Sequence, residues 1–382
     1  MKHNSHMDGF PFAVEPESFN KQSPKNMLQY SLGATLYMPG TKQVFDKIQN
    51  DTLTDLSSMV MCMEDAIDEK DLEAAELNVL EHLDAISESL SRDSSFIDRL
   101  PLIFTRVRNL AQFRRFAEHL TPERVQGLTG VVFPKFDSSN AEEYLDILSG
   151  VNHRVGGQLY CMPILEGASI AFAETRMPEL VRIKEIIQPH ADSVLNIRVG
   201  GTDFSAFFGV RREINSSIYD ILPVQGCLAD IINIFGRFTD GYTLSAPVWE
   251  YFLAYNGEDL GELLDDSIHT SLLRRNTIIN DAVDGLLREV ILDKANGFVG
   301  KTVIHPSHLR FVNAMQAVTR EEYEDATQIL GMTGGVAKSQ QQNKMNEVGP
   351  HGNWAKRVVS RARAYGVVER ESSYLQLMLN RL

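Results

Sequence analysis

The sequence has few cysteines and no long apolar stretch. Only three cysteines occur, Cys62, Cys161 and Cys227, and none belongs to a Cys-x-x-Cys pair. This spacing gives no support to a disulfide framework or a paired zinc site, and it favours buried free thiols. No run approaches the roughly 18 apolar residues that a membrane helix needs, and the N-terminus does not have the charged-then-apolar pattern of a secretory signal. We therefore expect a soluble cytoplasmic protein that does not bind membranes.

Basic residues are also scarce relative to acidic ones. The chain has 37 Lys and Arg against 51 Asp and Glu, a formal net charge of −14. Such a chain attracts polyanions poorly, so we expect no nucleic-acid partner. Neither GxGxxG nor GxxxxGK[ST] follows the first apolar run, and HExxH and GxSxG are absent. Nucleotide-binding open sheets, zinc hydrolases and serine hydrolases therefore have no motif in their favour.

What the sequence does contain is one rhythm, repeated from residue 30 onward. A short apolar run rich in β-formers alternates with a polar break and an amphipathic stretch of helical spacing. Such alternation predicts parallel strands joined by helices, and eight units favour a closed α/β (β/α)₈ TIM barrel over the rival, a doubly wound open sheet. The runs are Ser31–Tyr37, Met59–Met63, Leu102–Val107, Gly130–Phe133, Leu159–Leu165, Val194–Val199, Tyr242–Ala246 and Phe298–Ile304.

The rest of the chain suggests segments outside the barrel proper. We set residues 1–25 aside as an N-terminal tail and assign 26–312 to the barrel, with a helical insertion at 252–276. Residues 313–382 are expected to form a C-terminal helical lid. Within the lid, the Gly-, Gln-, Lys- and Asn-rich stretch that begins near Thr333 predicts a mobile loop, and a final helix is expected over 354–365.

In a barrel, the reactive groups lie where strands end and loops begin. Glu166 and Asp203 are carboxylates that follow the fifth and sixth runs, so adjacent strands would bring them to one mouth. A hard divalent ion, Mg²⁺, suits one or two carboxylates completed by water and substrate oxygens. The alternative is that these acids cap helices, as Asp203 could do for the segment that follows it.

Glu64, Asp65 and Arg106 form a second group of candidates. The two acids come directly after the second run, where they could order water near a metal, or simply favour the first turn of a helix. Arg106 lies inside an apolar strand, so its guanidinium needs carboxylate partners or an anionic substrate. A purely structural ion pair is the alternative for Arg106.

Further polar residues at strand ends are candidates for substrate binding. The Gly200-Gly201 pair before Asp203 would let the backbone approach a ligand, or merely permit a tight turn. His305 precedes a proline, so its ring could point into the mouth or pack against neighbours. The complete set of substrate-binding candidates is Arg106, Lys42, Gly201, Pro134, Lys135 and His305.

Taken in order, seven segments resemble those of the citrate lyase beta subunit and HpcH/HpaI aldolase superfamily. They run from LYMPGTKQVFDKI through MEDAIDEKDLEAAELNV, FTRVRN, GVVFPKFDSS, PILEGA and IRVGGTDFSAFFG to GFVGKTVIHPSHL. The resemblance implies a barrel in which Glu166 and Asp203 bind Mg²⁺. It further implies that Arg106 grips the substrate carboxylate or carbonyl and that Glu64 and Asp65 support metal-bound water.

Some segments depart from that pattern. Thr41 and Lys42 stand where citrate lyase-like members carry an arginine, so the use of a coenzyme A thioester is uncertain. The lid acid that such members supply to a neighbouring subunit corresponds loosely to Glu347, in Lys344-Met345-Asn346-Glu347. The 252–276 insertion and the segments SAPVWEY and NEVGPHGNWA resemble a divergent branch, the barrel-fold carbon–carbon bond lyases of tellurite-resistance-type gene clusters.

The leading hypothesis is therefore a Mg²⁺-dependent carbon–carbon lyase of aldol or Claisen type. It would act on a small oxo acid or an acyl thioester through a metal-stabilised enolate, with Arg106, Glu64, Asp65 and Glu347 as catalytic candidates. Two alternatives are a thioester hydrolase that uses the same metal site and a non-catalytic barrel scaffold. The resemblance also implies a homotrimer or hexamer.

Overall fold

The structure, a computed structural model, describes residues 1–4, 7, 9–50, 52–53, 55–252 and 278–379. The insertion expected at 252–276 lies outside the described residues, apart from Phe252. Within the described residues, no helix is long and apolar enough to span a bilayer.

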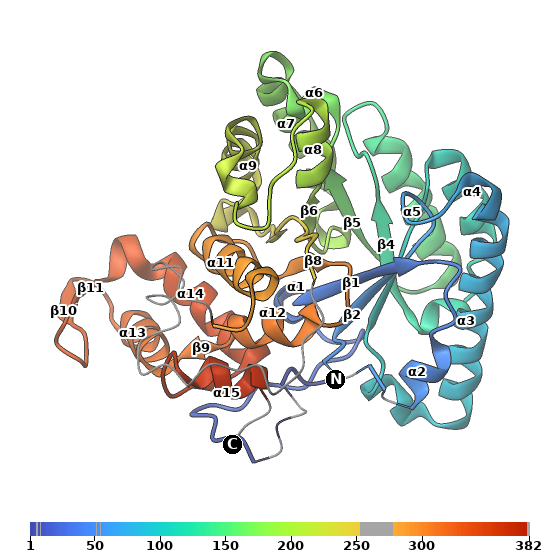
Figure 1. The fold of residues 1–382 in the computed structure, drawn as a ribbon. Helices are drawn as coiled ribbons and strands as arrows, with labels where there is room; N and C mark the ends of the chain where they lie inside the picture. Colours follow the sequence, from blue (N-terminus) through green and yellow to red (C-terminus); the bar gives the residue numbers. More distant parts are fainter. Residues whose placement is uncertain (5–6, 8, 51, 54, 253–277, 380–382) are drawn as a thin grey trace.

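Eight parallel strands form the predicted barrel (Figure 1). Seven consecutive strands are paired in chain order, and β8 pairs with β1. A parallel bridge between Ala246 and Lys301 joins β7 to β8, so the sheet closes on itself. The strands are β1 Ala34–Pro39, β2 Ser58–Cys62, β3 Leu102–Arg106, β4 Leu128–Phe133, β5 Tyr160–Leu165, β6 Ile197–Val199, β7 Leu244–Ser245 and β8 Lys301–Val303.

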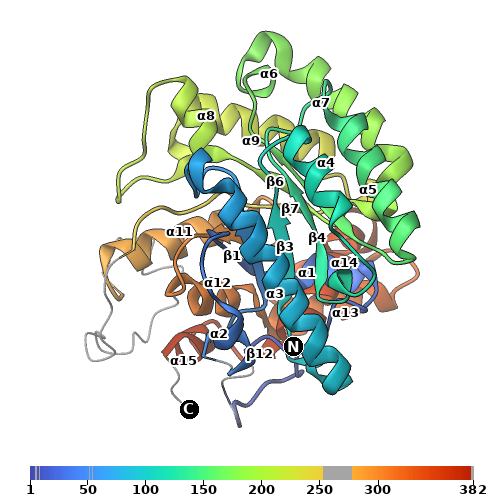
Figure 2. The same cartoon turned by 90° about the vertical axis from the view of Figure 1, so that its right-hand side faces the viewer.

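Helices cover the outside of the strands. Figure 2 shows α3, α4 and α5 along one flank of the barrel. Strands β2 and β4 are buried at every position, because one face packs inside the barrel and the other against helices. The barrel helices are α2 Phe45–Gln49, α3 Leu72–Arg92, α4 Leu110–Glu118, α5 Ala141–Val155, α6 Ala168–Ala171, α7 Ala173–Ile187, α8 Gly201–Phe207, α9 Leu222–Phe235, α11 Asp281–Ala295 and α12 His308–Gln316.

The first 25 residues are not the separate tail that we expected. Met7, Phe10 and Phe19 are buried in the main core, and the His3 ring lies 2.9 Å from the carbonyl oxygen of Ser31. Helix α1, Lys25–Ser31, leads directly into β1. The apolar side chains of this segment pack under the barrel and are removed from water. The sequence did not indicate this packing, because these side chains are separated by many polar residues.

The C-terminal residues pack under the base of their own barrel, the end at which the strands begin. They form α13 Arg320–Gly331, α14 Val348–Tyr365 and α15 Ser373–Leu379, with a two-stranded sheet of β9 Val318–Thr319 and β12 Val367–Val368. Arg357 of α14 donates to the carbonyls of Gly236 and Gly297, which precede β7 and β8. These helices therefore do not cover the mouth of their own barrel. Whether they close over a neighbouring subunit stays a prediction.

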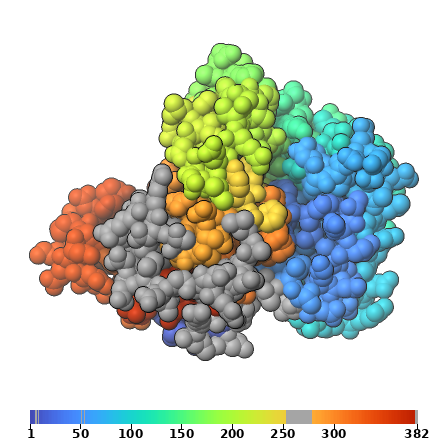
Figure 3. Space-filling model, in the orientation of Figure 1, coloured from blue at the N-terminus to red at the C-terminus, as the bar shows by residue number. Residues whose placement is uncertain are grey.

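The stretch after Thr333 contains ordered structure instead of the expected mobile loop. β10 Val336–Lys338 and β11 Met345–Glu347 pair in antiparallel fashion, and α14 begins at Val348, ahead of the predicted start. The buried amide of Asn346 donates to Asp325 and Gln328 of α13, and Lys344 pairs with Glu321 and Asp325 of the same helix, so polar side chains anchor the hairpin. The hairpin projects from one side of the molecule, in the orange-red part of Figure 3.

Candidate active site

Glu166 and Asp203 meet at the mouth of the barrel, the end at which the strands finish. Glu166 follows β5, and Asp203 lies in the first turn of α8, directly after β6. Gly200 lies between them. A Cβ at this position would come within 2.5 Å of Glu166 Oε2 and 2.9 Å of Asp203 Oδ2. The two carboxylates therefore converge on one small space that only glycine leaves open.

The charges of these carboxylates are poorly compensated. Burial raises the pKa of Glu166 to about 8, and the charge of Asp203 adds to the effect. The pKa of Asp203 is also raised, chiefly by burial. Arg106 and Lys135 act in the opposite direction but do not offset these effects, so the two neighbouring carboxylates resist ionisation.

A charged cluster stands beside this pair. Arg106, at the end of β3, places Nη2 2.9 Å from Glu64 Oε2, and Lys135 places Nζ 2.5 Å from Glu64 Oε1. The backbone N–H of Lys135 also donates to Glu166 Oε1, at 2.8 Å. Lys135 has a positive φ of 47°, a strained backbone for a residue with a side chain. Lys135 thus links the two glutamates, because its side chain contacts Glu64 and its backbone N–H contacts Glu166.

Asp65 has a different environment from Glu64. Its backbone N–H donates to Glu64 Oε2 at 2.9 Å, while its own carboxylate lies 3.7 Å from both Arg106 and Lys135. Burial and the adjacent Glu64 raise the pKa of Asp65 to about 6, whereas Arg106 and Lys135 work in the opposite direction. Arg106 holds the pKa of Glu64 below its ordinary value. The pair thus combines a fixed anion with a carboxyl that exchanges a proton near neutral pH.

The interior of the barrel adds residues that the sequence analysis did not single out. The guanidinium groups of Arg106 and Arg198 lie 5.5 Å and 5.3 Å from the centre of the Tyr37 ring. Arg198 donates to the hydroxyls of Thr35 and Thr302, and Arg106 Nε donates to Cys62 Sγ at 3.1 Å. Arg198 stands inside an apolar run just as Arg106 does, so the same argument would have found it.

The other predicted residues, Pro134, Lys42 and His305, lie at or near strand ends but differ in burial and in their contacts. Pro134 is buried directly after β4, and Lys42 is exposed after β1. The ring of His305 stacks on Phe252 and contacts the Ser307 hydroxyl, and no hydrogen bond or ion pair links it to the carboxylate cluster in the described part of the chain.

Two predicted residues do not lie at the mouth cluster. Gly201 does not face the carboxylates, because it is packed against Pro247 and Ile218; Gly200 takes that place. Glu347 lies in the projecting hairpin, where its backbone N–H donates to the His351 ring. It therefore does not reach the mouth of its own barrel.

The donor set at the mouth fits a divalent cation of the magnesium type. Among the described residues, no group of three or more His, Cys, Asp or Glu side chains is arranged to hold a metal ion. A closed zinc site is therefore not formed there, whereas Mg²⁺ needs only one or two carboxylates and takes its other ligands from water and substrate. The space beside Gly200 and the incompletely compensated charge of Glu166 and Asp203 meet that requirement.

Two solved structures show the same fold at low sequence identity. CitE from Mycobacterium tuberculosis, in complex with magnesium, acetoacetate and coenzyme A, is 17% identical, with a TM-score of 0.52 over 87% of this chain and 99% of that chain. Haloferax volcanii malate synthase, in a magnesium and glyoxylate complex, is 14% identical, with a TM-score of 0.50 over 72% of each chain. Comparison with curated protein sequences gives no significant match.

A protein-family model covers most of the chain, from residue 26 to residue 367. The match includes the whole barrel, the mouth residues described above, and helices α13 and α14. It confirms the expected relationship to carbon–carbon lyases of barrel fold. The chain belongs to the family of C–C bond lyases of the TIM-barrel fold.

Proposed function

We propose that the protein is a Mg²⁺-dependent lyase that breaks or forms a carbon–carbon bond next to the carbonyl of a small oxo acid or acyl thioester. The observation that carries this proposal is the convergence of Glu166 and Asp203 around Gly200, beside the Arg106 guanidinium. Cleavage of such a bond leaves an electron pair that must be delocalised onto the carbonyl oxygen. Positive charge near that oxygen is therefore the main catalytic requirement.

Glu166 and Asp203 would hold the ion. When bound, Mg²⁺ would supply a Lewis acid for the substrate carbonyl. The ligands of the two similar structures, acetoacetate with coenzyme A and glyoxylate, belong to the same chemical class and guide the choice of probes.

Arg106 is the residue that we propose grips the substrate. Its Nη2 is held by Glu64 and its Nε by Cys62, and Nη1 makes no hydrogen bond within the described residues. A guanidinium fixed on two sides can offer its remaining N–H groups to a carboxylate or carbonyl oxygen with little loss of entropy. Lys135 and Glu64 act as positioning residues, because they hold Arg106 and the Glu166 carboxylate in place.

Asp65 is the group that we propose moves the proton. In the cleavage direction, the substrate hydroxyl loses a proton, the carbon–carbon bond breaks, and the carbon that receives the electron pair gains a proton. Burial and Glu64 raise the pKa of Asp65 to about 6, so this carboxyl can accept and return a proton near neutral pH. Its side chain is 57% exposed, which allows exchange with solvent or substrate.

Two finer points remain part of the proposal. Glu347 would serve the mouth of a neighbouring subunit in a homotrimer or hexamer, because its hairpin projects away from its own barrel. Lys42, exposed after β1, would meet the distal part of a substrate such as a coenzyme A thioester.

Hydrogen–deuterium exchange tests the proposal without knowledge of the natural substrate. The protein is incubated with Mg²⁺ in D₂O, with pyruvate, acetoacetate or acetyl-coenzyme A, and the protons next to the carbonyl are followed by NMR. We expect loss of these signals in at least one probe. EDTA or the substitution Asp203→Asn should abolish the exchange.

The rival functions give different results. Release of free thiol from acetyl-coenzyme A, without proton exchange, would indicate a thioester hydrolase. A scaffold would show no exchange and no Mg²⁺-dependent heat by calorimetry. Either result contradicts the proposed lyase.

A further inference from the structure

A second cavity lies at the base of the barrel, at the opposite end from Glu166 and Asp203. It has a volume of about 700 Å³ and is formed by segments that precede β7 and β8, the end of α11, and helices α13, α14 and α15. This volume is within the range typical of small-ligand sites. Because all strands run from base to mouth, its lining residues are separated from the mouth by the length of the barrel. None of the residues assigned above to the lyase site lines this base cavity, and neither does Glu347.

The base cavity gathers positive charge on a strongly acidic protein. Its lining contains four cationic side chains, Lys294, Lys344, Arg357 and Arg361, against three acidic ones, Glu321, Glu322 and Glu371. The whole chain carries a net charge of −14. A local excess of cations is therefore a property of this cavity and is not inherited from the composition of the chain.

Several of these charges already have partners. Lys344 lies 2.8 Å from Glu321 and 2.7 Å from Asp325. Glu322 caps α13, where it accepts from the N–H and the hydroxyl of Thr319. Arg357 is held by two carbonyl oxygens, those of Gly236 and Gly297, and neither carries a full negative charge.

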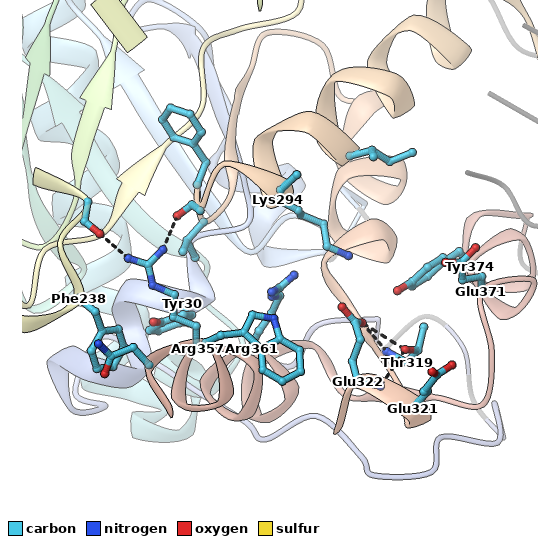
Figure 4. A pocket seen from close by; sticks show the side chains of 18 of the residues that line it. Tyr30, Phe238, Lys294, Thr319, Glu321, Glu322, Arg357, Arg361, Glu371 and Tyr374 are labelled. Atoms are coloured by element: carbon cyan, nitrogen blue, oxygen red, sulfur yellow. Dashed lines mark hydrogen bonds between the residues drawn. The ribbon is translucent and has the colours of Figure 1, made fainter. Parts of the chain in front are cut away.

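Lys294 and Arg361 are the cations that an incoming anion would meet. Lys294 Nζ donates to the Met315 carbonyl at 2.7 Å, and Figure 4 shows it pointing across the cavity toward Glu322. Arg361 makes no hydrogen bond or ion pair within the part of the chain that the structure describes. Burial lowers the pKa of Lys294 to about 8, and the charge of Arg361 lowers it further. The charges of Glu322 and Glu371 act on Lys294 in the opposite direction, and Lys294 and Arg361 both lower the pKa of Glu322. Two cations therefore share the buried Glu322 carboxylate, and a further anion would be attracted by the charge that Glu322 leaves over.

The indole ring of Trp354 lies beside the cations in the lining of the base cavity. Trp354, Arg357 and Arg361 are three and four residues apart on α14, a spacing that places them on one face of the helix. The Trp354 side chain is 39% exposed, whereas the other tryptophan, Trp249, is only 1% exposed. An exposed indole beside cationic side chains is the combination that binds phosphates and planar bases.

The base cavity also continues into a smaller one. A space of about 170 Å³ shares Tyr30, Phe238 and Arg357 with it. Tyr30 and Phe238 line both spaces, and Tyr242 lines the smaller one. A ligand with a charged end and a ring therefore fits this mixed lining of cations and aromatic rings better than a compact inorganic ion.

We propose that the base cavity binds a nucleoside phosphate, with the phosphates between Lys294 and Arg361 and the ring against Trp354. This site is separate from the lyase site and does not depend on the lyase proposal. It gives the protein a second ligand at the opposite end of the barrel.

Titration of the full-length protein with ADP tests the proposal. EDTA is present, so that no metal–nucleotide complex can form at the mouth, and binding is followed by calorimetry and by tryptophan fluorescence. We expect saturable binding with a change in Trp354 emission. Arg361→Met should weaken binding by about tenfold or more, the effect of losing one charge-assisted contact. The matched control is Arg363→Met on the same helix, which removes a surface pair with Glu17 and should leave ADP affinity unchanged.

Two further measurements separate the parts of the proposal. Trp354→Phe should weaken binding of ADP more than binding of pyrophosphate, because only ADP carries a ring. Asp203→Asn should bind ADP as the unmodified protein does. The proposal is overturned if ADP shows no saturable binding at millimolar concentration, if Arg361→Met binds ADP normally while folded by circular dichroism, or if Asp203→Asn abolishes binding.

Discussion

At the scale of single residues, the proposed site depends on which partners each charged side chain contacts. Glu166 and Asp203 could be predicted from the sequence, because acids that directly follow adjacent parallel strands must share one edge. Arg106 was predicted as a buried cation that needs acid partners, and Glu64 supplies one. Tyr37 was not singled out, because an apolar run does not tell which of its residues face the barrel interior. Arg198 was overlooked, although the argument used for Arg106 applies to it.

Replacement of Arg106 by lysine tests the role of the guanidinium. Lysine keeps the positive charge but cannot hold Glu64, Cys62 and a substrate oxygen at once. We expect Arg106→Lys to lower kcat/KM by about a hundredfold, or roughly 3 kcal/mol, with normal folding. The matched control is Arg108→Lys, two residues along the chain, which should retain most activity in the same steady-state assay. Equal rates in both variants would argue against a role for Arg106.

The substitution Asp203→Asn should separate stability from metal binding. The pKa of Glu166 in the folded protein, about 8, lies above its ordinary 4.5, so folding favours the protonated form. Without metal, stability should therefore fall as the pH rises from about 4.5 to 8, and removal of the Asp203 charge should lessen the fall. A gain on the order of 2 kcal/mol at pH 8 and little at pH 5 is expected for the variant in EDTA.

Urea unfolding at both pH values, with and without Mg²⁺, measures these effects. Mg²⁺ should stabilise the unmodified protein at pH 8 but not the variant. Asp146→Asn, an exposed carboxylate on α5, is the control and should change neither quantity. Stabilisation of Asp203→Asn by Mg²⁺ equal to that of the unmodified protein would place the ion elsewhere.

At the scale of elements, apolar runs predicted the strands well. All eight barrel strands overlap the predicted runs, because burial on both faces selects continuous β-forming segments. The β10–β11 hairpin was missed, because its stability comes from Asn346 and Lys344 contacting α13 and not from local composition. Residues 1–25 were misjudged for the same reason: their apolar side chains are few, and only the folded barrel gives them a surface to bury.

The turn between β6 and α8 offers a test at this scale. In Gly200→Ala, the added Cβ would press on Glu166 and Asp203, which must then move apart. We expect at least a tenfold loss of Mg²⁺ affinity by calorimetry, since one ion can no longer contact both carboxylates. Gly150→Ala is the control, because a Cβ there meets nothing within 4 Å, and helix α5 should gain slightly in stability. Unchanged Mg²⁺ affinity in Gly200→Ala would mean that the space beside Gly200 does not hold the ion.

At the scale of the whole molecule, closure of the barrel follows from the number of repeated units, but the position of the C-terminal helices does not. The amphipathic pattern of α13 and α14 shows that each has a face to bury, and it does not specify the surface. The structure places them under their own barrel, and the hairpin with Glu347 points away from the mouth. A contribution of Glu347 to catalysis therefore requires a second copy of the chain.

Complementation between two inactive variants tests that requirement. Co-expression of Asp203→Asn with Glu347→Gln should restore part of the lyase activity, because mixed oligomers would contain mouths in which both residues are intact. Co-expression of Asp203→Asn with Arg106→Lys is the control and should restore none, since both changes affect the mouth of one barrel. No recovery in the first pair, despite mixed oligomers by mass spectrometry, would remove Glu347 from the mechanism.

The most direct test of the central claim is a crystal of the protein soaked with Mn²⁺ as a substitute for Mg²⁺, with anomalous diffraction recorded. The account predicts a single strong peak at the mouth, about 2.0 to 2.3 Å from one carboxylate oxygen of Glu166 and one of Asp203. Addition of oxaloacetate or pyruvate should bring its oxygens to the same ion, with a carboxylate oxygen within hydrogen-bond distance of Arg106. A peak elsewhere, or none at the mouth under saturating Mn²⁺, would contradict the assignment of the metal site and with it the proposed lyase mechanism.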